Sequence, residues 1–141
     1  MKNAYSTYRS ANVDTADQGK LIIIAYDVAI KHCRLSLEKF GSYELIEQRT
    51  KHLFKAQDAL NELMSALRMD VGQIAQNLYQ LYDYMIRRLI HANSNDDKSA
   101  VEECLTYLVD LRDAWQVAIR NVKTQNASSD TAGNDSIAIT G

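Results

Sequence analysis

The chain has 141 residues, which is enough for one domain with a single core and too few for two. It is 46% hydrophobic and 24% charged with a formal net charge of −2, so no concentrated basic surface is expected that would bind nucleic acid or an anionic membrane. Neither of its two cysteines belongs to a CxxC motif, and no signal peptide is recognisable at the N-terminus. We therefore expect reduced thiols and a cytoplasmic protein.

The first segment, residues 1–16, is polar except for Tyr5, Tyr8 and Val13. We expect it to form an N-terminal arm. Aromatic side chains in a polar arm have no core of their own, so Tyr5 and Tyr8 are predicted to dock onto another surface.

Four amphipathic helices are predicted over residues 17–123, because no proline interrupts them and apolar residues recur at helical spacing. Thr15 with Gln18 has the spacing of a capping box. Asp70 with Gln73 has the same spacing. The four helices are expected to run from Asp17 to Phe40, from Ser42 to Arg68, from Asp70 to Asn93 and from Asp97 to Val122. Short connections favour antiparallel neighbours, so the expected fold is all-α, an antiparallel up-down four-helix bundle.

The last segment, residues 124–141, is small and polar. It offers too little apolar surface to offset the entropy lost on ordering, and is predicted to be a disordered C-terminal tail.

The first helix carries more apolar surface than a bundle core requires. At 100° per residue, the apolar residues between Leu21 and Cys33 cover roughly 260° of its circumference, whereas a core-facing helix needs an arc only somewhat above about 100°. The surplus must be covered by the interior of a tight bundle, by the arm, by a second copy of the chain or by a protein partner. A self-associating bundle that dimerises through this helix is therefore one alternative.

The segment at residues 77–93 is the richest in aromatic and apolar side chains. One face of this helix is predicted to carry Ile74, Leu78, Leu81, Tyr82, Met85 and Leu89. Asp83 and Arg87 have the i,i+4 spacing of an ion pair on the opposite side. Tyr84 is predicted to be an exposed aromatic. This helix suits both packing in a bundle and contact with a partner.

No catalytic or metal-binding constellation is visible. A di-iron bundle would need glutamates with a histidine three residues later, and no glutamate has one. His52 with Lys55 and Ala56 is similar to the motif of histidine phosphotransfer domains, in which an exposed imidazole takes a phosphoryl group. His52 also lies at the margin of an apolar face, where a structural role is the alternative.

Several segments, in order and at matching spacing, resemble the FliS family of flagellar export chaperones, which bind flagellin. These segments are Ala4-Tyr5, Thr15-Ala16-Asp17, Lys20-Leu21-Ile22, Tyr26-Asp27-Val28-Ala29, Gly72-Gln73-Ile74-Ala75, Asn77 to Asn93, and Asp113-Ala114-Trp115. The chain departs from the family at Gln18, where proline is usual, and at Val71-Gly72, where paired glycines are usual. Proline there only presets the backbone, so its absence should leave function intact.

The resemblance implies a helical-bundle chaperone that binds the C-terminal segment of flagellin, prevents premature polymerisation and keeps flagellin competent for type III export, without ATP, cofactor or metal. Export-apparatus or regulatory proteins are possible further partners. The candidate partner-binding residues are Tyr5, Tyr8, Leu21, Ile24, Tyr26, Leu78, Tyr82 and Met85. For each of the helical positions, plain bundle core is the alternative.

Overall fold

A computed structural model of the chain describes the backbone of residues 15–140 and the side chains of residues 18–125 apart from Val71. The described residues form helices α2 (Thr15–Leu37), α3 (Ile46–Ser65), α4 (Gln73–Ser94) and α5 (Lys98–Thr140). Single 3-10 turns, η1 (Tyr43–Leu45) and η2 (Met69–Val71), precede α3 and α4. No strand occurs between residues 15 and 140, and the predicted all-α fold is confirmed.

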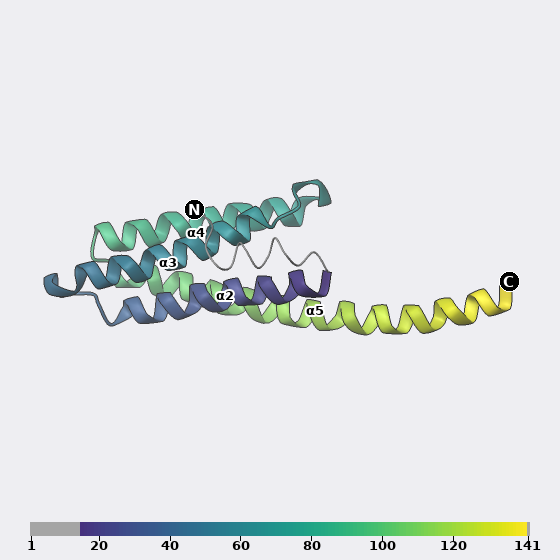
Figure 1. Ribbon diagram of the computed structural model, residues 1–141. Coiled ribbons are helices and arrows are strands. Elements are labelled where there is room, and N and C mark those ends of the chain that lie inside the picture. Colours follow the sequence, from purple (N-terminus) through teal and green to yellow (C-terminus); the bar gives the residue numbers. More distant parts are fainter. Residues whose placement is uncertain (1–14, 141) are drawn as a thin grey trace, which may run out of the picture.

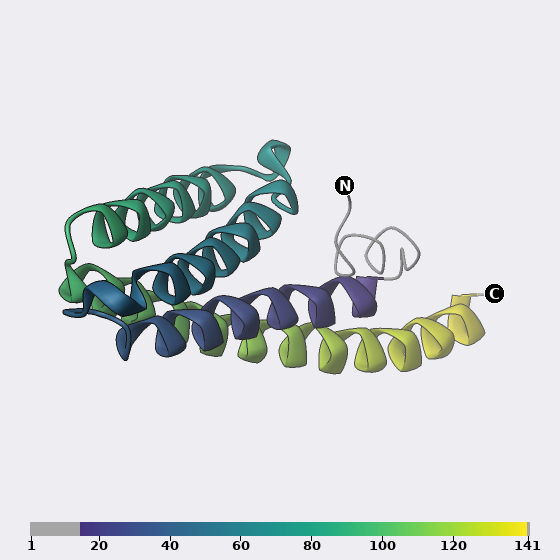
Figure 2. The same cartoon turned by 60° about the vertical axis from the view of Figure 1, so that its left-hand side comes forward.

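The four helices form an antiparallel up-down bundle (Figure 1). Each helix packs against the next along the chain, and α5 returns to lie beside α2, which closes the ring. Toward the end at which α2 begins, α3 and α4 diverge from α2 and α5 (Figure 2). The predicted bundle architecture is therefore confirmed, with one end spread wider than the other.

Four predicted helix ends differ from the observed ones by three or four residues, because the first two connections have their own structure: α2 ends at Leu37, α3 spans Ile46–Ser65 and α4 begins at Gln73. Gly41 and Gly72 have φ angles of +80° and +105°, a backbone region that favours glycine, and they punctuate the first two connections. The predicted capping box at Asp70 is wrong: Asp70 lies in η2 and pairs with Arg68, and α4 begins only at Gln73. Asp97 does cap α5, since its carboxylate accepts hydrogen bonds from the backbone N–H and hydroxyl of Ser99.

The C-terminal segment differs from the prediction. Helix α5 continues to Thr140, so its predicted end at Val122 is wrong, whereas the predicted disorder of residues 124–141 stays a prediction. Once a helix is nucleated, each further residue adds a backbone hydrogen bond at low cost, and no proline interrupts this stretch. The segment extends beyond the start of α2 (Figures 1 and 2). The boundaries of arm, bundle and tail as separate domains stay a prediction.

The core is built from all four helices around a pair of buried tyrosines. The hydroxyls of Tyr26 on α2 and Tyr82 on α4 are hydrogen-bonded to each other, and Trp115 on α5 packs against the same core. Burial raises the pKa of each tyrosine above its ordinary value. Cys33 and Cys104 are buried free thiols, and burial raises the pKa of each to about 12, which makes them poor nucleophiles.

Arg49, a buried arginine on α3, stabilises the end of the bundle opposite to the one at which α2 begins. Its guanidinium donates hydrogen bonds to the side chain and backbone carbonyl of Asn93 at 3.0 and 2.9 Å and pairs with Asp96 in the α4–α5 turn. The same guanidinium lies 4.6 Å above the ring of Phe40. The backbone N–H of Gly41 also donates to Asp96. One side chain thus links the α2–α3 connection, α3 and the α4–α5 turn.

Candidate partner-binding surface

The apolar faces of α4 and α5 continue beyond the packed core at the spread end of the bundle. On α4, Met85 is fully buried, Leu78 is half-buried and Ile74 is 69% exposed, although all three lie on one helical face. The side of this face that carries Met85, Leu78 and Ile74 therefore becomes more exposed toward the start of α4, whereas Ala75 in the first turn is buried.

Helix α5 shows the same gradient toward the same end. Leu108 is fully buried, Trp115 is half-buried and Val122, one heptad further on, is 47% exposed. We call this region the open end; it comprises Leu67, Ile74, Leu78, Trp115, Ile119 and Val122. Apolar side chains left exposed at one end of a helical bundle are typical of a surface that meets a partner.

The predicted partner-binding residues divide between the core and the surface. Leu21, Tyr26, Tyr82 and Met85 are buried, so in this conformation they shape the bundle and present no area to a partner. Two predicted positions remain accessible: Leu78 is half-buried at the open end, and Ile24 on α2 is 39% exposed. Tyr5 and Tyr8 lie outside the described residues.

The surplus apolar surface of α2 is largely covered within the chain. This helix packs against both α3 and α5, and only Ile24 and Leu35 among its described large apolar residues are exposed. The geometry therefore favours the interior of a tight bundle over a broad dimer face on α2.

Tyr84 is exposed, as its place on the polar side of the helix predicts, and its hydroxyl donates to Glu103 at 2.7 Å. Arg88 pairs with the same carboxylate at 2.9 Å. These hydrogen bonds hold the pKa of Glu103 below its usual range. These three side chains link α4 to α5 on the surface of the bundle. The exposed Tyr84 therefore has a structural role in this link.

His52 faces another imidazole rather than solvent. Its Nδ1 lies 3.0 Å from Nδ1 of His32 on α2, and the rings are stacked with centroids 5.2 Å apart. Burial, followed by the charges of His52, Lys31 and Lys55, lowers the pKa of His32. A half-buried imidazole engaged across two helices is not the free phosphoryl acceptor that a phosphotransfer domain needs.

Two further classes of site were sought in the described part of the chain. Within it, no three histidine, cysteine, aspartate or glutamate residues gather in a way that would hold a metal ion. No helix there combines the length and hydropathy required to cross a bilayer.

Ile74 is a surface residue that the sequence alone misplaced. Its periodicity puts it on the core face, and only the position of the neighbouring helices leaves it exposed. The sequence analysis also did not single out Gly19. This glycine lets α2 lie close to α5, because a β-carbon at Gly19 would lie 3.2 Å from the side chain of Ile119. Its small size in an otherwise bulky first helix was the available signal.

The fold defines an antiparallel four-helix bundle with apolar side chains exposed at one end. The family model described as flagellar protein FliS matches residues 1–122. The flagellar secretion chaperone FliS of Bacillus subtilis is 32% identical over 129 residues, which cover 92% of this chain and 96% of that protein. The FliS of Vibrio cholerae is 30% identical over 121 residues, 82% of this chain and 88% of that protein.

A third relative matches more closely over a shorter stretch. The FliS of Salmonella typhimurium is 51% identical over 45 residues, 32% of this chain and 33% of that protein. The chain belongs to the FliS family of flagellar secretion chaperones. The resemblance seen in the sequence is confirmed.

Proposed function

We propose that this chaperone binds the C-terminal region of flagellin at the open end, prevents its premature polymerisation and keeps it competent for flagellar type III export. It acts in the cytoplasm by binding alone, without catalysis, ATP or metal. The observation that carries the placement is the shared exposure gradient along α4 and α5, which leaves Ile74 and Val122 uncovered at one end.

The physical basis is coupled folding and binding. An unassembled flagellin terminus with amphipathic character would order as it docks, placing its apolar face on the open end. Burial of that face removes the surface that would otherwise associate with other flagellin molecules. The binding free energy would come from buried apolar and aromatic area, reduced by an ordering cost of a few kcal/mol.

The arm is part of this proposal. In the sequence it precedes α2, and α2 begins at the open end of the bundle (Figure 2). Tyr5 and Tyr8 each combine a large apolar ring with one hydrogen-bonding tip, which suits contact with a docked helix. Among the predicted residues whose side chains the structure describes, Ile24 and Leu78 remain accessible.

The test is calorimetric titration with a peptide that covers the C-terminal region of the flagellin from the same organism. We expect a one-to-one complex with a clearly negative heat-capacity change, because apolar surface is buried. Ile74→Ser should weaken binding about tenfold, since it removes most of one exposed anchor. The matched control is Ile90→Ser, on the same helix and 49% exposed but outside the open end.

Three outcomes separate the parts of the proposal. Absence of binding by the intact chain would refute flagellin as the partner. Equal losses for Ile74→Ser and Ile90→Ser would refute the open end as the site while leaving the partner in place. Light scattering across a dilution series addresses the homodimer: a mass that halves on dilution would show a self-association interface in addition.

A further inference from the structure

Two imidazole side chains face each other between α2 and α3, away from the open end. Nδ1 of His32 lies 3.0 Å from Nδ1 of His52, which is 20 residues further along the chain. His32 is near the end of α2 and His52 is near the start of α3, so the pair lies toward the end of the bundle that Arg49 stabilises. Both rings are half-buried, which leaves part of each in contact with solvent.

The two facing nitrogens share one proton when both rings are neutral. One Nδ1 then donates it and the other accepts it. Within the described part of the chain, neither ring has another hydrogen-bond partner. If both rings carry their proton on Nε2 instead, both Nδ1 atoms present a lone pair to the same space. Two imidazole lone pairs in one place are the donor set that a transition-metal ion takes.

The separation of the two nitrogens fits a shared metal ion. An imidazole nitrogen lies about 2.0–2.1 Å from zinc, so two of them at angles between about 90° and the tetrahedral value are about 2.8–3.4 Å apart. The observed 3.0 Å falls within this interval. A linear arrangement would need about 4 Å. Each ring only has to turn about its Cβ–Cγ bond to aim its lone pair at the ion, and this torsion is soft in histidine.

The donor atoms also select the kind of ion. Mg²⁺ and Ca²⁺ take oxygen ligands, whereas imidazole nitrogen suits the late transition metals, among which Cu²⁺ binds more tightly than Zn²⁺. We propose that His32 and His52 together bind a divalent late transition-metal ion, Zn²⁺ or Cu²⁺, through their Nδ1 atoms. Water fills the remaining coordination positions, because the site has two protein ligands.

Two lysines oppose the binding of a cation here. The positive charges of Lys31 on α2 and Lys55 on α3 act on His32. Both lysines are exposed, so water and salt screen most of the repulsion. Replacing both of them with glutamine should raise the affinity for the ion about threefold, the effect of a modest surface charge interaction.

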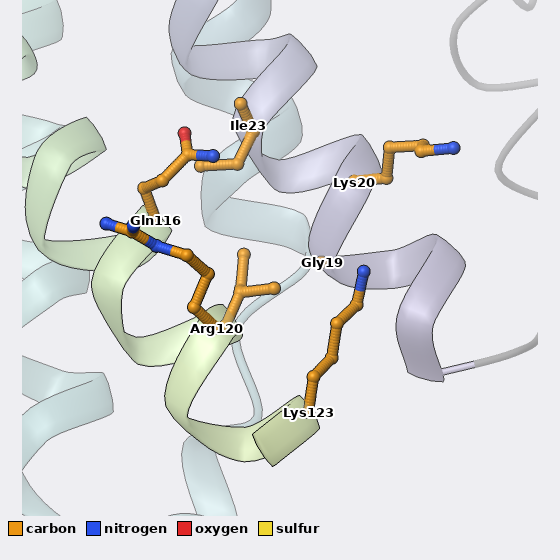
Figure 3. Close-up of a pocket in the computed structure, with 7 residues that line it drawn as sticks. Gly19, Lys20, Ile23, Gln116, Arg120 and Lys123 are labelled. Carbon is orange, nitrogen blue, oxygen red and sulfur yellow. The ribbon is translucent and has the colours of Figure 1, made fainter. Parts of the chain in front are cut away.

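The pocket beside Gly19 is unsuited to a metal ion. It has a volume of about 190 Å³ and lies between the first turns of α2 and the part of α5 that passes them (Figure 3). Lys20, Arg120 and Lys123 contribute to its lining. Three positive charges around one pocket repel a cation, so metal ions should prefer the histidine pair.

An ion held by both histidines links α2 to α3. Because it binds the folded state, it stabilises the bundle in proportion to its occupancy. At a zinc concentration ten times the dissociation constant, the melting temperature should rise by about 4 °C. The site is remote from the open end, so zinc should leave the binding of the flagellin peptide unchanged. The proposal therefore stands or falls separately from the proposed function.

The experiment titrates the ¹⁵N-labelled full chain with zinc chloride and follows the imidazole nitrogens by NMR at neutral pH. We expect one ion per chain, with the Nδ1 signals of His32 and His52 shifting together while those of His91 stay unchanged. With copper sulfate, electron paramagnetic resonance should show coupling to two imidazole nitrogens. Magnesium chloride at the same concentration should have no effect.

Single variants test each ligand. His32→Gln and His52→Gln should each lower the affinity for zinc at least about tenfold and remove the rise in melting temperature, since even the partners of metal ligands contribute that much. The matched control is His91→Gln, which removes an exposed histidine on α4 and should keep both effects. Circular dichroism confirms that each variant is folded at the temperature of the titration, so a loss of binding is not a loss of fold.

Other results would overturn the proposal. Zinc-induced shifts at Nε2 instead of Nδ1 would show that single rings bind the ion from the solvent side. Equal losses of affinity in His91→Gln and His52→Gln would show unspecific binding to exposed histidines. Unchanged affinity in His32→Gln and His52→Gln would place the ion elsewhere. Absence of binding to the folded chain at millimolar zinc would leave the pair as a hydrogen bond between two helices.

Discussion

Replacing Arg49 with methionine tests how strongly one buried side chain stabilises the end of the bundle that contains the α2–α3 connection and the α4–α5 turn. Methionine keeps a long apolar stem beside Phe40 and removes the guanidinium. Arg49 is 2% exposed, and its bonds to the Asn93 side chain and backbone carbonyl span α3 and the end of α4. Two hydrogen bonds from a charged donor contribute about 1.5 kcal/mol each.

The ion pair with Asp96 adds less, because that carboxylate is 55% exposed and is screened by water. We assign it about 0.5 kcal/mol. Removal of the guanidinium also relieves its desolvation cost, which offsets part of the loss. The expected destabilisation is about 2–3 kcal/mol, which corresponds to a fall of about 8 °C in the melting temperature of a chain of this size.

The assay is thermal unfolding followed by circular dichroism, with urea unfolding for the free energy. The matched control is Arg68→Met, whose ion pair with Asp70 at 3.2 Å is exposed on both sides. Its expected cost is close to zero, because both side chains are exposed and water screens their attraction. If both variants lose the same small amount, the argument that burial gives Arg49 its importance is refuted.

Two further predictions concern pH and the tail. The lowered pKa of His32 means that the folded state favours the neutral imidazole; the associated stability is fully present above the unfolded pKa near 6.5 and is lost as the pH falls below it. We expect the melting temperature to drop between pH 7.5 and 5.0 and His32→Gln to flatten this dependence, whereas an unchanged slope in the variant would contradict the pairing with His52. Deleting residues 126–141 should leave the melting temperature within about 1 °C of the full chain, because surface changes remote from the core have small effects; a large loss would mean that the end of α5 packs on the bundle.

The number, order and direction of the helices followed from periodicity and short connections. Periodicity also placed Tyr26, Tyr82 and Met85 on apolar faces, and the structure buries all three. It did not reveal which part of a face remains uncovered, because exposure depends on where the neighbouring helices diverge. Ile74 and Met85 therefore looked alike in the sequence, although one is 69% exposed and the other is fully buried.

The role of Arg49 had no local signal. Its partners lie 44 and 47 residues away, and their approach depends on the turn that places Asp96 at a φ of +49°. The pocket beside Gly19 is similar, since its lining comes from two helices that are far apart in the chain.

The amino-acid sequence by itself determined the all-α class, the four-helix order and the FliS family, because these depend on residue pattern along single helices. Only the tertiary structure decided which apolar residues are in the core, which lie at the open end, and which basic residues form ion pairs with carboxylates. Those outcomes depend on the relative positions of helices, and a helix's own periodicity carries no information about how far its neighbours extend.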